Sequence, residues 1–219
     1  MLPRSSKKYR SLFVDRALTN NLVLVEGIGL CPLIGGATTL KASVALFLCA
    51  MITLILTNLL MLLVGRKLPN VLRIPIHALC AMTLLCGEAY LINTFISTEL
   101  YAKLYLFLPL LSVTTLFAYH GENTVGDFDP RAGFVDAFAS SVGFGVVICI
   151  VGAIREIAAR RTLWDKPLSL SVDLPEASLP FAAFLLLGLM AALLERGKAV
   201  AAERAKRREP TVTGGADHD

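Results

Sequence analysis

Apolar residues in this chain gather into six segments that are separated by shorter polar stretches. The four longest segments cover residues 42–64, 74–95, 134–154 and 179–194. A bilayer core of about 30 Å takes about 20 helical residues per crossing, and the first two segments reach that length without a Lys or Arg. The remaining two segments, residues 23–36 and 104–117, are short and are interrupted by Gly or Pro.

The order of these segments is short, long, long, and this order occurs twice along the chain. It predicts an all-α integral membrane protein with six transmembrane helices, built as two inverted three-helix repeats at about 19–95 and 104–195, with the first and fourth helices broken. Interrupted helices at corresponding positions of a repeat are where membrane transport proteins place sites near the middle of the bilayer.

The six helices are expected to form one membrane domain, residues 19–199. Residues 1–18 would be a cytoplasmic N-terminal segment, and residues 200–219, which are charged and Gly-rich, a disordered cytoplasmic tail. The composition agrees with a membrane protein, because 55% of residues are hydrophobic, 17% are charged and the mean hydropathy is +0.66. Six crossings in 219 residues leave no room for a soluble domain.

Lys and Arg in the loops predict the orientation of the chain, because they favour the cytoplasmic side. With six crossings both termini lie on one side, and that side carries fifteen Lys and Arg residues against six on the other. The six are Lys41, Lys103, Arg155, Arg160, Arg161 and Lys166. Both termini are therefore expected in the cytoplasm, and the net charge of +4 indicates membrane insertion rather than nucleic-acid binding.

Five cysteines are the first candidates for chemistry, and all of them lie in apolar segments. Cys49, Cys80, Cys86 and Cys149 are interpreted as small hydrophobic residues that pack in the membrane, and no CxxC pair is present. Cys31 differs, because ten residues counted from Asn21, at about 1.5 Å each, place it about 15 Å deep, at the middle of a bilayer core of about 30 Å. Gly27, Gly29 and Pro32 flank it and favour a break in the helix there.

The second short segment offers a residue at a similar depth. The same count from Lys103 places Thr115 about 18 Å deep from the opposite side. Glu26 and Glu88 are further candidates, because ionisable residues inside a membrane are functional candidates by default. Glu26 is either a solvated carboxylate near the headgroups or an ion ligand, and Glu88 either pairs with His77 or forms a hydrogen bond within the bundle.

The chain lacks a nucleophile–base pair, a phosphate-binding loop and a zinc motif, so chemistry by this chain alone is not expected. Several short motifs, in their order and spacing, instead resemble the RnfE/RsxE–NqrD family of membrane subunits from about residue 9 to residue 199. These motifs are NNLVLV at 20–25, GLCPL at 29–33, RIPI at 73–76, FLPL at 107–110 and GAIREI at 152–157, with TLWD at 162–165 favouring E over its homologue A.

The resemblance implies a membrane subunit of the Rnf electron-transport complex of the bacterial cell inner membrane. That complex passes electrons between reduced ferredoxin and NAD and couples this transfer to cation movement. The implied partners are an RnfA-like subunit, which forms an inverted pair with this one, and the B, C, D and G subunits of the Rnf complex. In the family a [2Fe–2S] cluster lies between the two paired subunits, with two Cys ligands from each.

Carried over to this sequence, the resemblance makes Cys31 of Gly-Leu-Cys-Pro the first cluster ligand, and so the metal-binding residue of this chain. The second family cysteine falls six residues after the Pro of the fourth segment, where this chain has Thr115. This departure matters because four thiolates normally hold such a cluster. Either another group completes the site, or the cluster is altered or absent.

Two alternatives follow from the same features. An autonomous secondary transporter with an inverted repeat also accounts for the broken segments, and it needs no iron. A redox-inert assembly scaffold derived from the family accounts for Thr115. Iron content and dependence on partner subunits distinguish these alternatives from the electron-transfer subunit.

Overall fold

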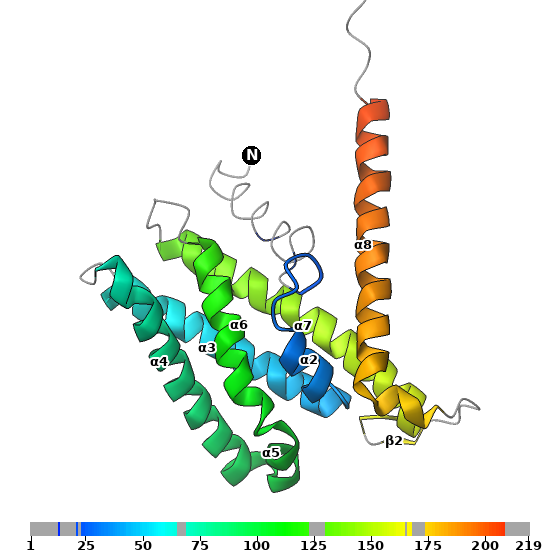
Figure 1. Ribbon diagram of the computed structural model, residues 1–219, viewed down its shortest axis with the longest axis horizontal. Coiled ribbons are helices and arrows are strands. Elements are labelled where there is room, and N and C mark those ends of the chain that lie inside the picture. The colour runs from blue at the N-terminus through cyan, green and yellow to red at the C-terminus, as the bar shows by residue number, and fades with distance from the viewer. Residues whose placement is uncertain are drawn as a thin grey trace, which may run out of the picture.

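The computed structural model describes residues 13, 21, 23–64, 69–122, 130–164, 166–167 and 174–208, and it is mostly helical (Figure 1). In chain order the elements are α2 Leu30–Gly36, α3 Leu40–Val64, α4 Asn70–Leu91, the π-helical turn η3 Ile92–Ile96, α5 Thr98–Leu104, α6 Phe107–Glu122, α7 Pro130–Arg160, β1 Thr162–Leu163, β2 Lys166–Pro167, the 3-10 turn η4 Pro175–Ser178 and α8 Pro180–Arg208.

Four helices in the described ranges are long and apolar enough to cross a membrane. Their candidate spans are Leu40–Met61, Val71–Ile96, Phe134–Arg160 and Pro180–Ala201. Each span overlaps one of the four long apolar segments, which agrees with the sequence-based expectation of an all-α membrane protein. The two strands β1 and β2 form only a minimal antiparallel hairpin, with Thr162 opposite Pro167.

Both short apolar segments are interrupted in the structure. In the first segment, Gly27 and Gly29 have φ angles of 69° and 82°, which glycine adopts easily, and α2 begins only at Leu30. In the second segment, α5 ends at Leu104 and α6 begins at Phe107. Pro32 and Pro109 each occupy the third position of the following helix, where a missing N–H costs no helical hydrogen bond.

The centre of the molecule is the antiparallel pair α3 and α7, whose backbones approach closely at two glycines. A Cβ atom on Gly145 would meet the ring of Phe47, and one on Gly152 would meet the hydroxyl of Ser43 and lie 3.2 Å from the carbonyl oxygen of Thr39. Small residues at a helix interface permit such a close approach of the backbones of two membrane helices. Gly145 therefore acts in helix packing.

The other helices pack around this pair. Helix α4 lies beside α6 and α3, whereas α8 contacts α2, α7 and η4 near its N-terminal end. Over the rest of its length α8 stands apart from the bundle (Figure 1), and only 11% of its candidate span is buried within this chain.

The structure corrects two predicted boundaries. Helix α7 continues to Arg160, six residues beyond the predicted end of the fifth crossing, so Arg155 is a helix residue and not a loop charge. Helix α8 continues to Arg208, so the first part of the predicted disordered tail is helical. Both boundaries were predicted too early because each helix continues past its apolar part into a charged end, and hydropathy alone does not show where that end lies. Apart from Phe13, the predicted N-terminal segment lies outside the described residues, as do residues 209–219.

Candidate functional site

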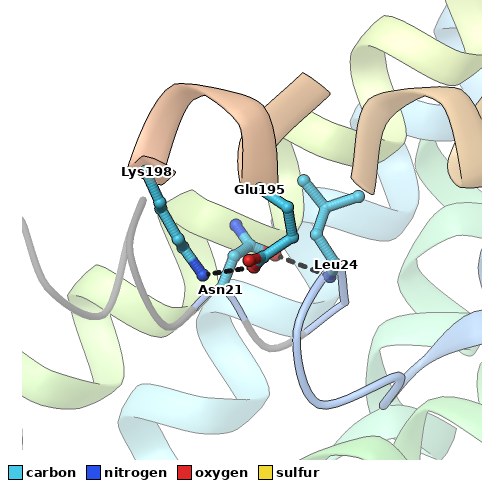
Figure 2. Close-up of polar contacts among 4 residues, drawn as sticks. All are labelled: Asn21, Leu24, Glu195 and Lys198. Carbon is cyan, nitrogen blue, oxygen red and sulfur yellow. Dashed lines mark hydrogen bonds and ion pairs between the residues drawn. The ribbon is translucent and has the colours of Figure 1, made fainter. Parts of the chain in front are cut away.

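The first broken segment starts at a side-chain cap. Asn21 is buried, and its Oδ1 atom accepts hydrogen bonds from the backbone N–H groups of Val23 at 3.0 Å and Leu24 at 3.3 Å. Figure 2 shows the bond to Leu24, together with the Glu195–Lys198 ion pair of α8, which is 2.8 Å long. Asparagine favours this type of turn because its side chain satisfies backbone donors nearby. The turn brings the chain to the two glycines that precede α2.

Gly29 joins α2 to α6 and α7. A Cβ atom on Gly29 would lie 2.9 Å from Cγ2 of Thr114 and 3.0 Å from Cε2 of Phe144, closer than side chains normally approach. Its φ of 82° also disfavours any residue with a Cβ atom. Both the backbone angle and the close packing therefore require glycine two residues before Cys31.

The packing of α2 on α6 sets the level of Cys31 relative to Thr115. Gly29 meets Thr114, and a Cβ atom on Gly35 would meet the ring of Phe107, so the two helices run antiparallel. On this register Cys31 is level with about residue 112 of α6, roughly 5 Å along the axis from Thr115. The two short segments thus lie side by side. The side chain of Thr115 lies outside the described part of the structure.

Cys31 lies in the first turn of α2 and is exposed on the surface of this chain. Of the cysteines interpreted as packing residues, Cys49 is buried and Cys80 and Cys149 are half-buried. Cys86 is exposed, because it faces away from the other helices of this chain. In the ranges that the structure describes, no three His, Cys, Asp or Glu side chains come together as a metal site.

The two membrane carboxylates have different surroundings. Glu26 is exposed in the bend before Gly27. Glu88 of α4 is half-buried, and its Oε1 atom accepts a hydrogen bond from the hydroxyl of Thr53 of α3 at 3.1 Å. Of the two alternatives for Glu88, the structure therefore has the hydrogen bond within the bundle.

Arg155 of α7 was predicted as an exposed loop charge, and this prediction is wrong. Arg155 is only 1% exposed to solvent, and all five N–H groups of its guanidinium have hydrogen-bond acceptors. The acceptors are the carbonyl oxygens of Ile34, Ala37, Ala177, Ser178 and Leu179, at 2.9, 2.9, 3.1, 2.7 and 3.4 Å. The guanidinium group thereby joins the C-terminal end of α2 to the segment that leads into α8.

Glu156, the next residue, is also 1% exposed and holds the start of α3. Its Oε2 atom accepts a hydrogen bond from the backbone N–H of Leu40 at 2.7 Å, and its Oε1 atom accepts one from the hydroxyl of Thr162 at 3.2 Å. Leu40 is the first residue of α3, whose N–H groups lack partners within the helix. Arg155 and Glu156 therefore hold the end of α2 and the beginning of α3 at neighbouring points.

Sequence reasoning missed this pair because it ended the fifth crossing at residue 154. The signal was present, since an Arg and a Glu that directly continue an apolar helix are unusual unless their polar groups are satisfied inside the protein. With the helix extended by one turn, both residues would have qualified as candidates for a role inside the membrane domain.

Comparison with known proteins identifies the family of membrane subunits to which this sequence is related. A family model described as "Rnf-Nqr subunit, membrane protein" matches residues 9–191. The chain belongs to the Rnf-Nqr family of membrane subunits. The interrupted segments, Cys31 and the Arg155–Glu156 pair all lie within the matched region of this family.

Curated relatives carry a more specific name, that of the E subunit of the ion-translocating oxidoreductase complex. The chain is 32% identical to this protein from Shewanella sp. (strain ANA-3) and from Shewanella baltica (strain OS185), over 93% of this chain and 92% of each relative. The protein of the same name from Shewanella oneidensis is 30% identical, over 92% of this chain and 91% of the relative. This Rnf-Nqr protein is thus similar to E subunits along nearly its whole length.

Proposed function

We propose that this Rnf-Nqr protein is the E-type membrane subunit of an Rnf-type ferredoxin:NAD oxidoreductase. In that role it relays electrons across the bilayer midplane, through an iron–sulfur cluster shared with an RnfA-like subunit, and the relay is coupled to cation translocation. The observation that carries the proposal is the exposed Cys31 thiol, which lies at a helix break beside α6 in a chain similar to E subunits.

The arrangement of the helices supports the two-repeat architecture that the relay requires. The first repeat contains α2, α3 and α4, and the second contains α6, α7 and α8 in the same order. If each helix is replaced by its counterpart, the pair α3–α4 corresponds to α7–α8, and the pair α4–α6 corresponds to α8–α2. Each of these pairs is in contact. A pseudo-two-fold relation of this kind would bring both interrupted segments to the centre of the membrane.

The donor atoms of this chain fit a cluster between subunits and do not fit one enclosed by this chain. A [2Fe–2S] cluster is normally held by four thiolates. Cys31 supplies one thiol, on the surface where a neighbouring subunit can approach, and Thr115 supplies a hydroxyl in place of the second family cysteine. A partner subunit would therefore have to supply most of the sulfur ligands.

Within such a site the cluster would supply one-electron transfer, and the residues of this chain would place a ligand and exclude water. Gly27 and Gly29 allow the backbone to turn so that Cys31 begins a short helix. The packing of α2 on α6 fixes the level of the thiol. Flavin and NAD chemistry would belong to other subunits of the complex.

Substitution of Cys31 in the assembled complex tests the proposal. We expect Cys31→Ala to abolish the midplane iron signal in electron paramagnetic resonance and to abolish electron transfer, while the complex still assembles. Cys49→Ala is the matched control, because Cys49 is buried between helices. This substitution is expected to leave iron content and electron transfer nearly unchanged.

Iron content separates the proposal from its alternatives. Equal loss of iron in Cys31→Ala and Cys49→Ala would contradict the assignment of Cys31 as a ligand. A complex that assembles without iron at this position would favour the redox-inert scaffold. Substrate binding by the isolated subunit would favour the secondary transporter.

A further inference from the structure

We infer that Arg155 and Glu156 are positioning residues that hold α2, and with it the Cys31 thiol, in place against α6. The inference deepens the proposed function, and it rests on that function only in assigning Cys31 to a cluster. That the pair fixes α2 follows from the contacts of Arg155 with the end of α2 and of Glu156 with the start of α3.

Helix α2 is too short to be stable without help. It has seven residues, its start at Gly29 has no side-chain cap, and isolated helices of this length are marginal in water. In a membrane, every backbone carbonyl at its C-terminal end also needs a hydrogen-bond donor from the protein. The position of α2 must therefore be fixed by groups outside it.

Arg155 supplies the missing donors at the C-terminal end of α2. Its Nη1 atom donates to the carbonyl oxygens of Ile34 and Ala37, both at 2.9 Å, which are three and six residues beyond Cys31. A positive charge is also favoured there by the helix dipole. On its other side the same guanidinium donates to Ala177, Ser178 and Leu179, so the position of α2 depends on the segment before α8.

Glu156 holds the other end of the connection. The turn between α2 and α3 contains only Ala37, Thr38 and Thr39, so fixing the N–H of Leu40 also limits movement of α2. Gly152, one helical turn before these residues, packs tightly against α3 and fixes the height of the pair. One end of α7 thus holds both sides of the α2–α3 turn.

The test uses the full chain in membrane vesicles, with a nitroxide spin label attached to a single cysteine. One version keeps Cys31, and a matched version keeps Cys86, which is exposed on α4 and distant in sequence from the pair. Each version carries Arg155→Met, Arg155→Lys, Glu156→Ala or Glu156→Gln. The line shape of the spectrum reports the ratio of mobile to immobile label.

In the Cys31 version, Arg155→Met and Glu156→Ala should raise the ratio of mobile to immobile label about tenfold or more, because hydrogen bonds to buried charged groups are lost. Arg155→Lys should give an intermediate ratio, since an ammonium group has three donors for five carbonyls. Glu156→Gln should restore the native line shape, because its amide oxygen can still accept from Leu40. The Cys86 version should be unchanged throughout.

An unchanged Cys31 line shape in Arg155→Met would overturn the inference, and so would an equal change at Cys86, which would indicate general unfolding. If Arg155→Met does not accumulate, unchanged spectra in both Arg155→Lys and Glu156→Ala would overturn it. The spin label reports the mobility of α2 in a chain that binds no iron. If the label at Cys31 becomes mobile in the Arg155 and Glu156 variants but the native complex contains no iron, the proposed cluster is refuted and the positioning role remains.

Discussion

Cys31 owes its place to residues that have no metal-binding chemistry of their own. Gly29 allows the left-handed turn and the contact with Thr114, and Arg155 holds the carbonyl groups beyond the thiol. The thiol itself is exposed, so in the isolated chain it has no enclosing site. In the proposed function, a cluster at Cys31 would therefore depend on a neighbouring surface and on the residue that α6 presents near the thiol.

Thr115→Cys tests whether α6 contributes that residue. A hydroxyl is a poor iron ligand compared with a thiolate, so a cluster bound by this chain should be labile. We expect Thr115→Cys to raise the amount of iron per complex, or to create iron binding where the native complex has none. The measurement is iron per assembled complex, together with the iron signal in electron paramagnetic resonance.

Thr114→Cys is the matched control for that experiment, because Thr114 is the buried neighbour that packs against Gly29. Thr114→Cys should not raise iron content, since the side chain at this position packs against Gly29 of the α2 segment and not beside the Cys31 thiol. Iron that stays unchanged in Thr115→Cys would contradict a site shared by Cys31 and Thr115, and the scaffold alternative would gain support.

Residue types and spacing predicted the candidate ligands but not the polar pair that holds them. The Gly and Pro residues around Cys31 predicted a break in the helix, because their backbone preferences are local. Arg155 and Glu156 were missed because the fifth crossing was ended at residue 154, and because their contacts with α2 and α3 join groups more than a hundred residues apart. No local pattern encodes a hydrogen bond of that range.

At the scale of elements, the α3–α7 pair provides the frame to which the short helices attach. The pair is close enough to exclude side chains at Gly145 and Gly152, and it includes the buried residues Leu46, Phe144 and Ile148. Because α7 also carries Arg155 and Glu156, a shift between α3 and α7 would move the α2–α3 turn.

Gly152→Ala tests the closeness of this packing. The added methyl group would meet Ser43 and the backbone of Thr39, and overpacking of this kind costs about 1–3 kcal/mol. We expect a lower thermal unfolding midpoint for the full chain in detergent. Gly188→Ala on α8 is the control, since a Cβ atom there has no neighbour within 4 Å, and it should not lower the midpoint.

Adding Ser43→Gly to Gly152→Ala should recover part of the lost stability, because it removes the nearest side-chain atoms. An unchanged midpoint in Gly152→Ala would show that the two helices can separate without cost.

The long helices were predictable because each carries enough apolar residues to span a bilayer. Their close packing was not, since a glycine within an apolar run does not specify which helix it meets.

At the scale of the whole molecule, burial of Arg155 strengthens the prediction of orientation. Removing it from the six loop charges on the side away from the termini leaves five, against fifteen on the termini side. The basic cluster of residues 155–166 agrees least well with this orientation, because it would face away from the cytoplasm, and Arg155 is its first member. Inside the protein its charge is satisfied by carbonyl groups and does not act as a topology signal.

The orientation is tested with reporter fusions in the bacterial membrane. We expect a reporter fused after Ala202, in the last part of α8, to lie in the cytoplasm, because the basic residues of that helix end favour the cytoplasmic side. A reporter inserted at Ser171, between α7 and α8, should lie on the opposite side. Alkaline phosphatase and a fluorescent protein report the two sides in opposite ways, so each position is measured twice. Reporters on the same side would rule out a crossing by α8 and, with it, the six-helix topology.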